Sequence, residues 1–121
     1  MPLVFLWYKA DRDLRELAEK LAQALPGIIG PELTVVGRDR HEGWVAPQDV
    51  IVRFEAGSVR DVNAKDIEIL IKAHDYPERV VNQEERKDAI IQGIRRVLGD
   101  FDRDISGYVW LELKPIAFGQ L

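Results

Sequence analysis

The chain has 121 residues, a net charge of −4 from 17 basic and 21 acidic side chains, and no cysteine. This length fits a single domain, residues 1–121, that buries about 65% of the surface its unfolded chain would expose. The lack of cysteine excludes disulfides and thiolate chemistry, and the nearly balanced charge argues against nucleic-acid binding. The longest apolar run, residues 2–8, is too short to span a bilayer, so we expect no membrane segment and a soluble, cytoplasmic protein.

The first predicted strand is Leu3–Tyr8, which is apolar on both faces and is therefore typical of a central strand covered on both sides. A helix is expected to begin after Asp13, because Asp13 and Glu16 have the spacing of a capping box. Pro26-Gly27 is expected to end that helix. An apolar stripe at helical spacing predicts that one helix face packs on a sheet: Leu14, Leu17, Ala18, Leu21 and Leu25.

Residues 28–49 are rich in proline and glycine and are predicted to be a long connection, with a candidate short strand at Leu33–Val36. A strand is predicted at Asp49–Glu55. Alternation along it places Val50, Val52 and Phe54 on a core face, and Ile51, Arg53 and Glu55 on the opposite face.

The second half of the chain repeats the same order of elements. A strand is predicted at Ile67–Ala73, followed by a loop over His74–Arg79. A second helix is expected after a capping box at Asn82–Glu85 and before Gly99, with an apolar stripe made by Ile90, Ile91, Ile94, Val97 and Leu98. A last strand is predicted at Tyr108–Leu113, and an apolar tail follows over residues 116–121.

This order predicts an α+β fold made of a duplicated β-α-β unit, with a four-stranded mixed sheet and two helices packed on one face. The strands are apolar on both sides, so the face without helices would stay exposed in a single chain. We therefore expect an oligomer that covers this second face, and the tail is a candidate for crossing to a neighbouring chain.

Several features together resemble the tautomerase superfamily, which includes 4-oxalocrotonate tautomerase, 5-carboxymethyl-2-hydroxymuconate isomerase and macrophage migration inhibitory factor. The chain opens with Met-Pro-Leu-Val-Phe-Leu, and the duplicated strand-helix-strand order covers its whole length. Arg12 lies ten residues after Pro2, directly before the first helix, where the 4-oxalocrotonate type has a substrate-binding arginine. Glu78-Arg79 is similar to the Gly-Arg-Ser of the hydroxymuconate isomerase type, and Trp110–Pro115 with Phe118-Gly119 is similar to the family's last strand and tail.

The resemblance implies a homotrimeric isomerase that needs no metal or organic cofactor. Its Pro2 amine would act as the general base and move a proton α to the carbonyl of a small 2-oxo or 2-hydroxy carboxylate. Arg12 and Arg79 would hold the carboxylate. The family's further arginine corresponds to Arg53, or to Arg38 if Leu33–Val36 is the second strand, and the sequence leaves these two alternatives open. Dehalogenation and decarboxylation, which relatives perform with the same amine, stay open as well.

The proposed base depends on removal of Met1, because a retained Met1 makes the Pro2 nitrogen an amide. An α-amino group titrates at about 7.7–8.0, and burial or nearby arginines lower its pKa. His74 and Tyr76 are candidate pocket residues ahead of Arg79, and Tyr108 and Trp110 are candidates for lining the same pocket. The alternative is a non-catalytic oligomer of the same fold that binds a small ligand or a protein.

Overall fold

The computed structural model describes residues 1–37, 43–101 and 103–121. Its main elements are β1 (Leu3–Tyr8), α1 (Arg15–Leu33), β2 (Ile51–Ala56), β3 (Ile67–His74), α3 (Gln83–Leu98) and β4 (Gly107–Lys114). Two short helices, η1 (Pro47–Asp49) and α2 (Pro77–Val80), precede β2 and α3. Among the described residues, no helix is both long and apolar enough to cross a membrane.

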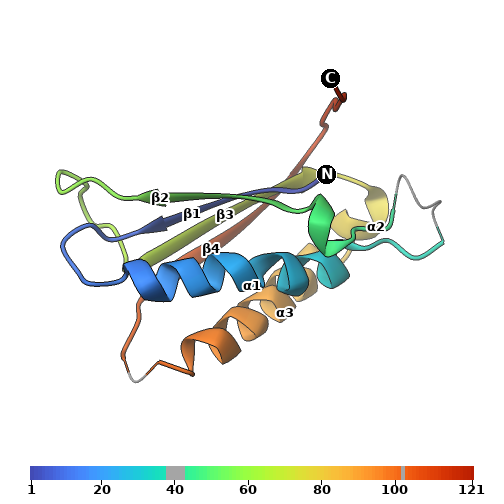
Figure 1. Cartoon of the computed structure of the whole chain (residues 1–121). Helices are drawn as coiled ribbons and strands as arrows, with labels where there is room; N and C mark the ends of the chain where they lie inside the picture. The colour runs from blue at the N-terminus through green and yellow to red at the C-terminus, as the bar shows by residue number, and fades with distance from the viewer. Residues whose placement is uncertain (38–42, 102) are drawn as a thin grey trace.

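The four strands form one sheet in the order β2-β1-β3-β4. β1 pairs parallel with β2, β3 pairs parallel with β4, and the two pairs meet antiparallel between β1 and β3. Figure 1 shows α1 and α3 side by side on one face of this sheet. The predicted α+β fold, with two β-α-β units and a mixed sheet, is confirmed.

Alternation along the central strands separates a core face from an open face. Val4 and Leu6 of β1 and Ile69 and Ile71 of β3 are essentially inaccessible to solvent and pack in the core with α1 and α3. The intervening side chains, such as Phe5 and its cross-strand neighbour Leu70, are only partly buried. The prediction that Leu3–Tyr8 is a central strand is confirmed.

α1 is longer than predicted, because it continues through Pro26 and Gly27 to Leu33. A proline inside a helix loses a hydrogen bond and costs about 3 kcal/mol. The apolar stripe continues beyond it, and Ile29 and Leu33 are fully buried. Burial of each such side chain contributes about 1.5–3 kcal/mol, which offsets much of the cost of the two prolines inside the helix, Pro26 and Pro31. The prediction that Pro26-Gly27 ends the helix is therefore wrong.

Neither predicted capping box forms. The N-cap of α1 is Leu14, a fully buried residue, and no side chain caps this end. Packing of Leu14 in the core thus sets where the helix begins. Asn82 is the N-cap of α3, but its Oδ1 accepts a hydrogen bond from Arg86 Nε at 2.6 Å instead of capping the backbone.

The connection between α1 and β2 also differs from the prediction. Leu33 is the last residue of α1, and the described residues up to 37 contain no strand, so the candidate strand at Leu33–Val36 is wrong. Arg38 lies outside the described residues. β2 begins at Ile51, and its predicted faces are confirmed, since Val52 and Phe54 pack against the core while Arg53 is exposed.

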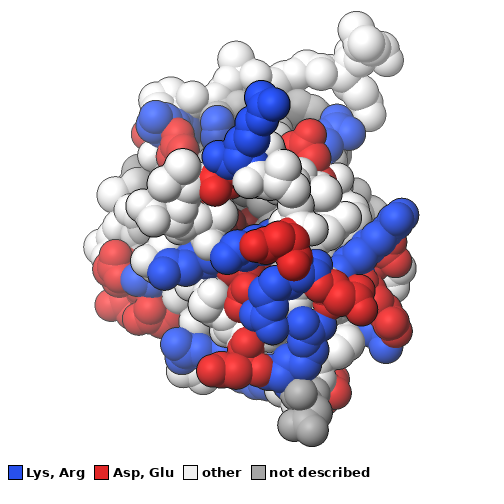
Figure 2. Space-filling model, turned by 90° about the vertical axis from the view of Figure 1, so that its left-hand side faces the viewer, with Lys and Arg blue, Asp and Glu red and all other residues white. Residues whose placement is uncertain are grey.

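Charged side chains of both signs are mixed on one face of the molecule (Figure 2). On the face shown in Figure 2, blue Lys and Arg side chains alternate with red Asp and Glu side chains. This face therefore offers no continuous basic surface of the kind that phosphate backbones require.

Candidate active site

The strand directions bring four segments to one end of the sheet. β1 and β2 begin there, and β3 and β4 end there, because the two parallel pairs run in opposite directions. Figure 1 shows the N-terminus at this end, with the tail leaving β4 beside it. A cavity of about 300 Å³ opens here, lined by Met1, Pro2, Trp44, Val45, Asp49, His74, Tyr76, Arg79, Ile116 and Phe118.

Pro2 is held rigidly at the head of β1. Its side chain is fully buried, and its carbonyl oxygen accepts a hydrogen bond from the Ile51 N–H at 3.1 Å. The contact extends the pairing of β1 with β2 by one step beyond Leu3. The backbone at Pro2 is thus fixed by the sheet, while Met1, which is 49% exposed, reaches the cavity mouth.

The cavity favours an uncharged amine. Burial lowers the pKa of the Met1 α-amino group below its usual range, and the positive charge of Arg79 lowers this pKa further. The negative charge of Asp49 acts in the opposite direction. The net shift is downward, so a larger share of the terminal amine is neutral, and able to accept a proton, near neutral pH than in open solvent.

Arg79 supplies a buried positive charge to this site and is only 3% exposed. Its Nε donates a hydrogen bond to the Leu33 carbonyl at 2.8 Å, and its Nη1 donates to the His74 carbonyl at 3.0 Å. The guanidinium also lies 4.9 Å from the centre of the Tyr76 ring. These contacts tie the end of α1 to the end of β3 and fix the orientation of the cation.

His74 and Tyr76 form one aromatic wall of the cavity. Their rings meet edge to face with 4.5 Å between centroids. The His74 Nδ1 accepts a hydrogen bond from the Ile116 N–H at 3.2 Å, so the tail is connected to the end of β3. The structure therefore brings Pro2, His74, Tyr76 and Arg79 together in one cavity.

Asp49 and Trp44 are site residues that the sequence reasoning missed. Asp49 Oδ2 accepts a hydrogen bond from the Ala46 N–H at 3.1 Å, and this contact holds η1 against the cavity. Its position just before β2 was a usable signal, since a parallel strand beside β1 must begin near Pro2. Trp44 belongs to a connection whose course no periodicity predicts.

Four other predicted site residues lie away from this cavity. Arg12 follows the far end of β1, about 20 Å along the strand from Pro2 at 3.3 Å per residue, and its Nη1 pairs with Asp66 Oδ2 at 2.8 Å. Arg53 lies on the open face of the sheet, in register with Phe5. Tyr108 and Trp110 lie on the same face of β4, with ring centroids 5.6 Å apart.

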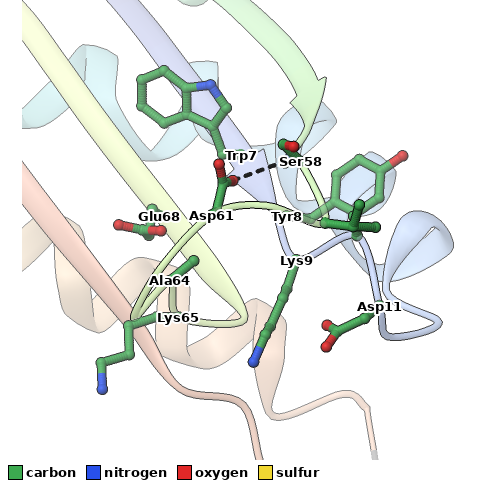
Figure 3. A pocket seen from close by; sticks show the side chains of 12 residues that line it. Trp7, Tyr8, Lys9, Asp11, Ser58, Asp61, Ala64, Lys65 and Glu68 are labelled. Atoms are coloured by element: carbon green, nitrogen blue, oxygen red, sulfur yellow. Dashed lines mark hydrogen bonds between the residues drawn. The ribbon is translucent and has the colours of Figure 1, made fainter.

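A second, smaller cavity of about 50 Å³ lies at the opposite end of the sheet. Figure 3 shows its lining, in which Trp7, Lys9 and Asp11 of the β1 end face a loop carrying Ser58 and Asp61. The Ser58 N–H donates to Asp61 Oδ2 at 2.9 Å, so this hydrogen bond shapes the loop itself. Its small size and mixed charges make it a less suitable ligand site than the cavity at Pro2.

Solved structures share the architecture described above. A macrophage migration inhibitory factor-like protein from Entamoeba histolytica matches 95% of this chain and 88% of its own, with a TM-score of 0.53 and 16% identity. FG41 malonate semialdehyde decarboxylase, solved with the inhibitor 3-bromopropiolate, matches 98% of this chain and 89% of its own, with a TM-score of 0.61 and 16% identity. The chain shares the fold of these two proteins.

A third structure with this fold is Pt0534 inactivated by 2-oxo-3-pentynoate, with a TM-score of 0.52 and 12% identity over 93% of this chain and 86% of its own. No protein-family model and no curated protein sequence matches the chain. At these identities the likeness establishes a shared fold, and the chemistry has to be argued from the residues of the cavity.

Proposed function

We propose that the chain is a keto-enol tautomerase that moves a proton α to the carbonyl of a small 2-oxo or 2-hydroxy carboxylate. The amine of Pro2, exposed by removal of Met1, acts as the general base. The observation that carries this proposal is the lowered pKa of the terminal amine beside the buried Arg79. Pro2 lines the same cavity and its side chain is fully buried, so an amine on Pro2 is subject to the same kind of desolvation.

The proposed reaction is a proton shift that needs no metal or organic cofactor. The neutral Pro2 nitrogen takes the hydroxyl proton of an enol, the carbonyl forms, and the resulting ammonium returns a proton to the adjacent carbon. One group thus serves as base and then as acid, which is efficient when its pKa lies near the working pH. Arg79 supplies the positive charge that attracts a substrate carboxylate.

Two observations support a small carboxylate as the substrate. A cavity of about 300 Å³ has the size of small-molecule sites. Two proteins of the same fold were solved with small carboxylates, 3-bromopropiolate and 2-oxo-3-pentynoate. The size of the cavity and the buried charge of Arg79 both suit a small carboxylate.

We also propose a homotrimer, because the open sheet face carries large aromatic side chains. Tyr108 and Trp110 on β4 are 51% and 46% exposed, and on β1 of the same face Phe5 and Trp7 stack on each other with 5.6 Å between ring centroids. A face of this composition is typical of contacts between chains. Arg53 lies on this same face, so its predicted role as a substrate ligand requires the cavity of a neighbouring chain.

The test begins with the N-terminus of the natively processed protein, by intact mass and N-terminal sequencing. Without Met1, the wild type should ketonise phenylenolpyruvate, and Pro2→Ala should lose most of that activity. The control is a chain with Met1 retained by an engineered extension, which should be equally inactive. Activity that survives in Pro2→Ala would rule out Pro2 as the base. Retained Met1 in native material would instead favour the non-catalytic, ligand-binding alternative.

A further inference from the structure

A hydrogen bond from the tail fixes which ring nitrogen of His74 carries the proton. The Ile116 N–H donates to Nδ1 at 3.2 Å, and a backbone amide can only donate. Nδ1 must therefore keep its lone pair, and the neutral ring carries its proton on Nε2. In a doubly protonated ring, the Nδ1–H and the Ile116 N–H would be two donors pointing at each other. The ring would then have to turn its Nδ1–H toward Asp75 Oδ1, which lies 3.8 Å from Nδ1.

The Nε2 edge of this ring is available to a ligand. Within the part of the chain that the structure describes, His74 Nε2 makes no hydrogen bond to protein, although His74 lines the cavity. The ring is fixed by its edge-to-face contact with Tyr76, and its own carbonyl accepts from Arg79. A fixed imidazole whose Nε2 makes no hydrogen bond to the described residues therefore lines the same cavity as Pro2.

The proposed reaction needs such a donor, because negative charge develops on the 2-oxo oxygen while the proton is in transit. Arg79 gives its Nε and Nη1 hydrogens to the Leu33 and His74 carbonyls. We infer that neutral His74 donates its Nε2–H to the 2-oxo oxygen of the substrate and stabilises the enolate, which makes His74 a catalytic residue. This inference rests on the proposed tautomerase function.

The balance of protons is simple in this arrangement. Pro2 nitrogen removes the hydroxyl proton of the enol, the oxygen lone pair forms the carbonyl π bond, and the alkene electrons take a proton back from the Pro2 ammonium at carbon. His74 keeps its proton throughout and contributes a hydrogen bond alone. A neutral imidazole suits this role, since it polarises the oxygen without adding a second acid to the site.

Two substitutions separate the two ring nitrogens. In His74→Asn the amide oxygen can replace Nδ1 as the acceptor for Ile116, but no donor reaches the place of Nε2. In His74→Gln the amide nitrogen can replace the Nε2–H donor, while the tail contact is lost. We expect His74→Asn to lower kcat about a hundredfold with little change in KM, and His74→Gln to stay within about tenfold of wild type. Equal activities of the two variants, or full activity in His74→Asn, would overturn the inference.

A second measurement works without turnover and keeps the two proposals distinguishable. ¹⁵N NMR of His74 should show the Nε2–H tautomer of the neutral ring, and phenylpyruvate should shift the Nε2 resonance in wild type and in Pro2→Ala alike. A Nδ1–H tautomer, or an Nε2 resonance unchanged at ligand saturation, would refute the role of His74. An inactive wild type that still gives both signals would refute the tautomerase proposal alone.

Discussion

Arg79 and Asp49 lie in the same cavity and act in opposite directions on the N-terminal amine. The guanidinium lowers the pKa of that amine and the carboxylate raises it, while burial makes the largest contribution to the net decrease. The protonated amine is thus destabilised by desolvation and by one neighbour, and stabilised by the other.

This opposition predicts two amine pKa changes of opposite sign. Arg79→Gln removes a positive charge, so the amine pKa should rise, whereas Asp49→Asn removes a negative charge, so it should fall. NMR titration of the ¹³C-methylated amine measures both shifts directly. Arg60→Gln, an exposed change in the loop after β2 at the opposite end of the sheet, is the control and should leave this pKa unchanged. An unaltered amine pKa in both cavity variants would contradict this electrostatic account.

Substitution by alanine should have opposite effects on stability at two helix glycines, Gly27 and Gly93. At Gly27, within α1, a Cβ would meet no atom within 4 Å, so Gly27→Ala should stabilise the chain by about 0.5–1 kcal/mol through reduced backbone entropy. At Gly93, within α3, a Cβ would lie 2.7 Å from Ile28 Cγ2 at the contact between the two helices. Gly93→Ala should therefore destabilise by about 1–3 kcal/mol.

Urea denaturation at fixed protein concentration measures both alanine variants. Because each change is small, the slope of the free energy of unfolding against urea should stay constant while the midpoint moves. A stabilised Gly93→Ala would show that the helices separate readily, and the packing of α1 on α3 would have to be revised.

Asp66 should make stability depend on pH in the acid range. Its Oδ2 accepts from the Ser106 N–H at 3.0 Å, from the Ser106 hydroxyl at 3.1 Å and from Arg12 at 2.8 Å. Burial opposes ionisation, but the contacts with Ser106 and Arg12 hold the pKa of Asp66 below its ordinary value. This contribution is present above the unfolded pKa of about 3.9 and is lost as pH falls through the lower folded pKa.

The Asp66→Asn variant should therefore lose about 1–3 kcal/mol of stability at neutral pH, and its difference from wild type should shrink as pH falls below about 4. Arg12→Ala is the matched comparison and should cost about 1 kcal/mol or less, because Arg12 is 38% exposed and its ion pair is partly screened. Urea midpoints between pH 7 and pH 3 measure both effects. A gap between wild type and Asp66→Asn that persists at pH 3 would contradict this account.

The parts of the fold that depend on local patterns were predictable from sequence. Alternation marked Leu3–Tyr8 as a central strand, and helical spacing of isoleucines located the helix before Gly99, so the α+β architecture followed. The length of α1 was not predictable by the same means, because Pro26 is a local signal to stop and the burial of Leu33 that overrides it is a tertiary effect.

The candidate site was predictable only where chain direction determines proximity. Pro2, His74 and Arg79 meet because β1 begins where β3 ends, and an antiparallel pairing of the two repeats implies this. Arg12 was assigned from its spacing to Pro2, but the strand between them carries it to the opposite end of the sheet. Asp49 was missed because no motif marks it: it lies in η1, and its charge acts on the amine because β2 begins beside the start of β1.

If the open sheet face is the contact between chains, the single substitution Trp110→Glu should weaken the trimer. Trp110 lies in register with Leu70 on this face and is 46% exposed in the single chain. If three chains bury this face together, Trp110→Glu places a charge in an apolar contact, where burial costs several kcal/mol. Light scattering should therefore give about three times 13.8 kDa for wild type and a smaller mass for Trp110→Glu.

Val62→Glu is the matched control for this change, because Val62 is an exposed apolar residue between β2 and β3, 83% accessible, and not part of the open sheet face. It should keep the wild-type mass, since its side chain already faces solvent. Circular dichroism should show that both variants retain the fold. A monomeric wild type, or a Trp110→Glu variant with unchanged mass, would mean that this aromatic face is not the contact between chains.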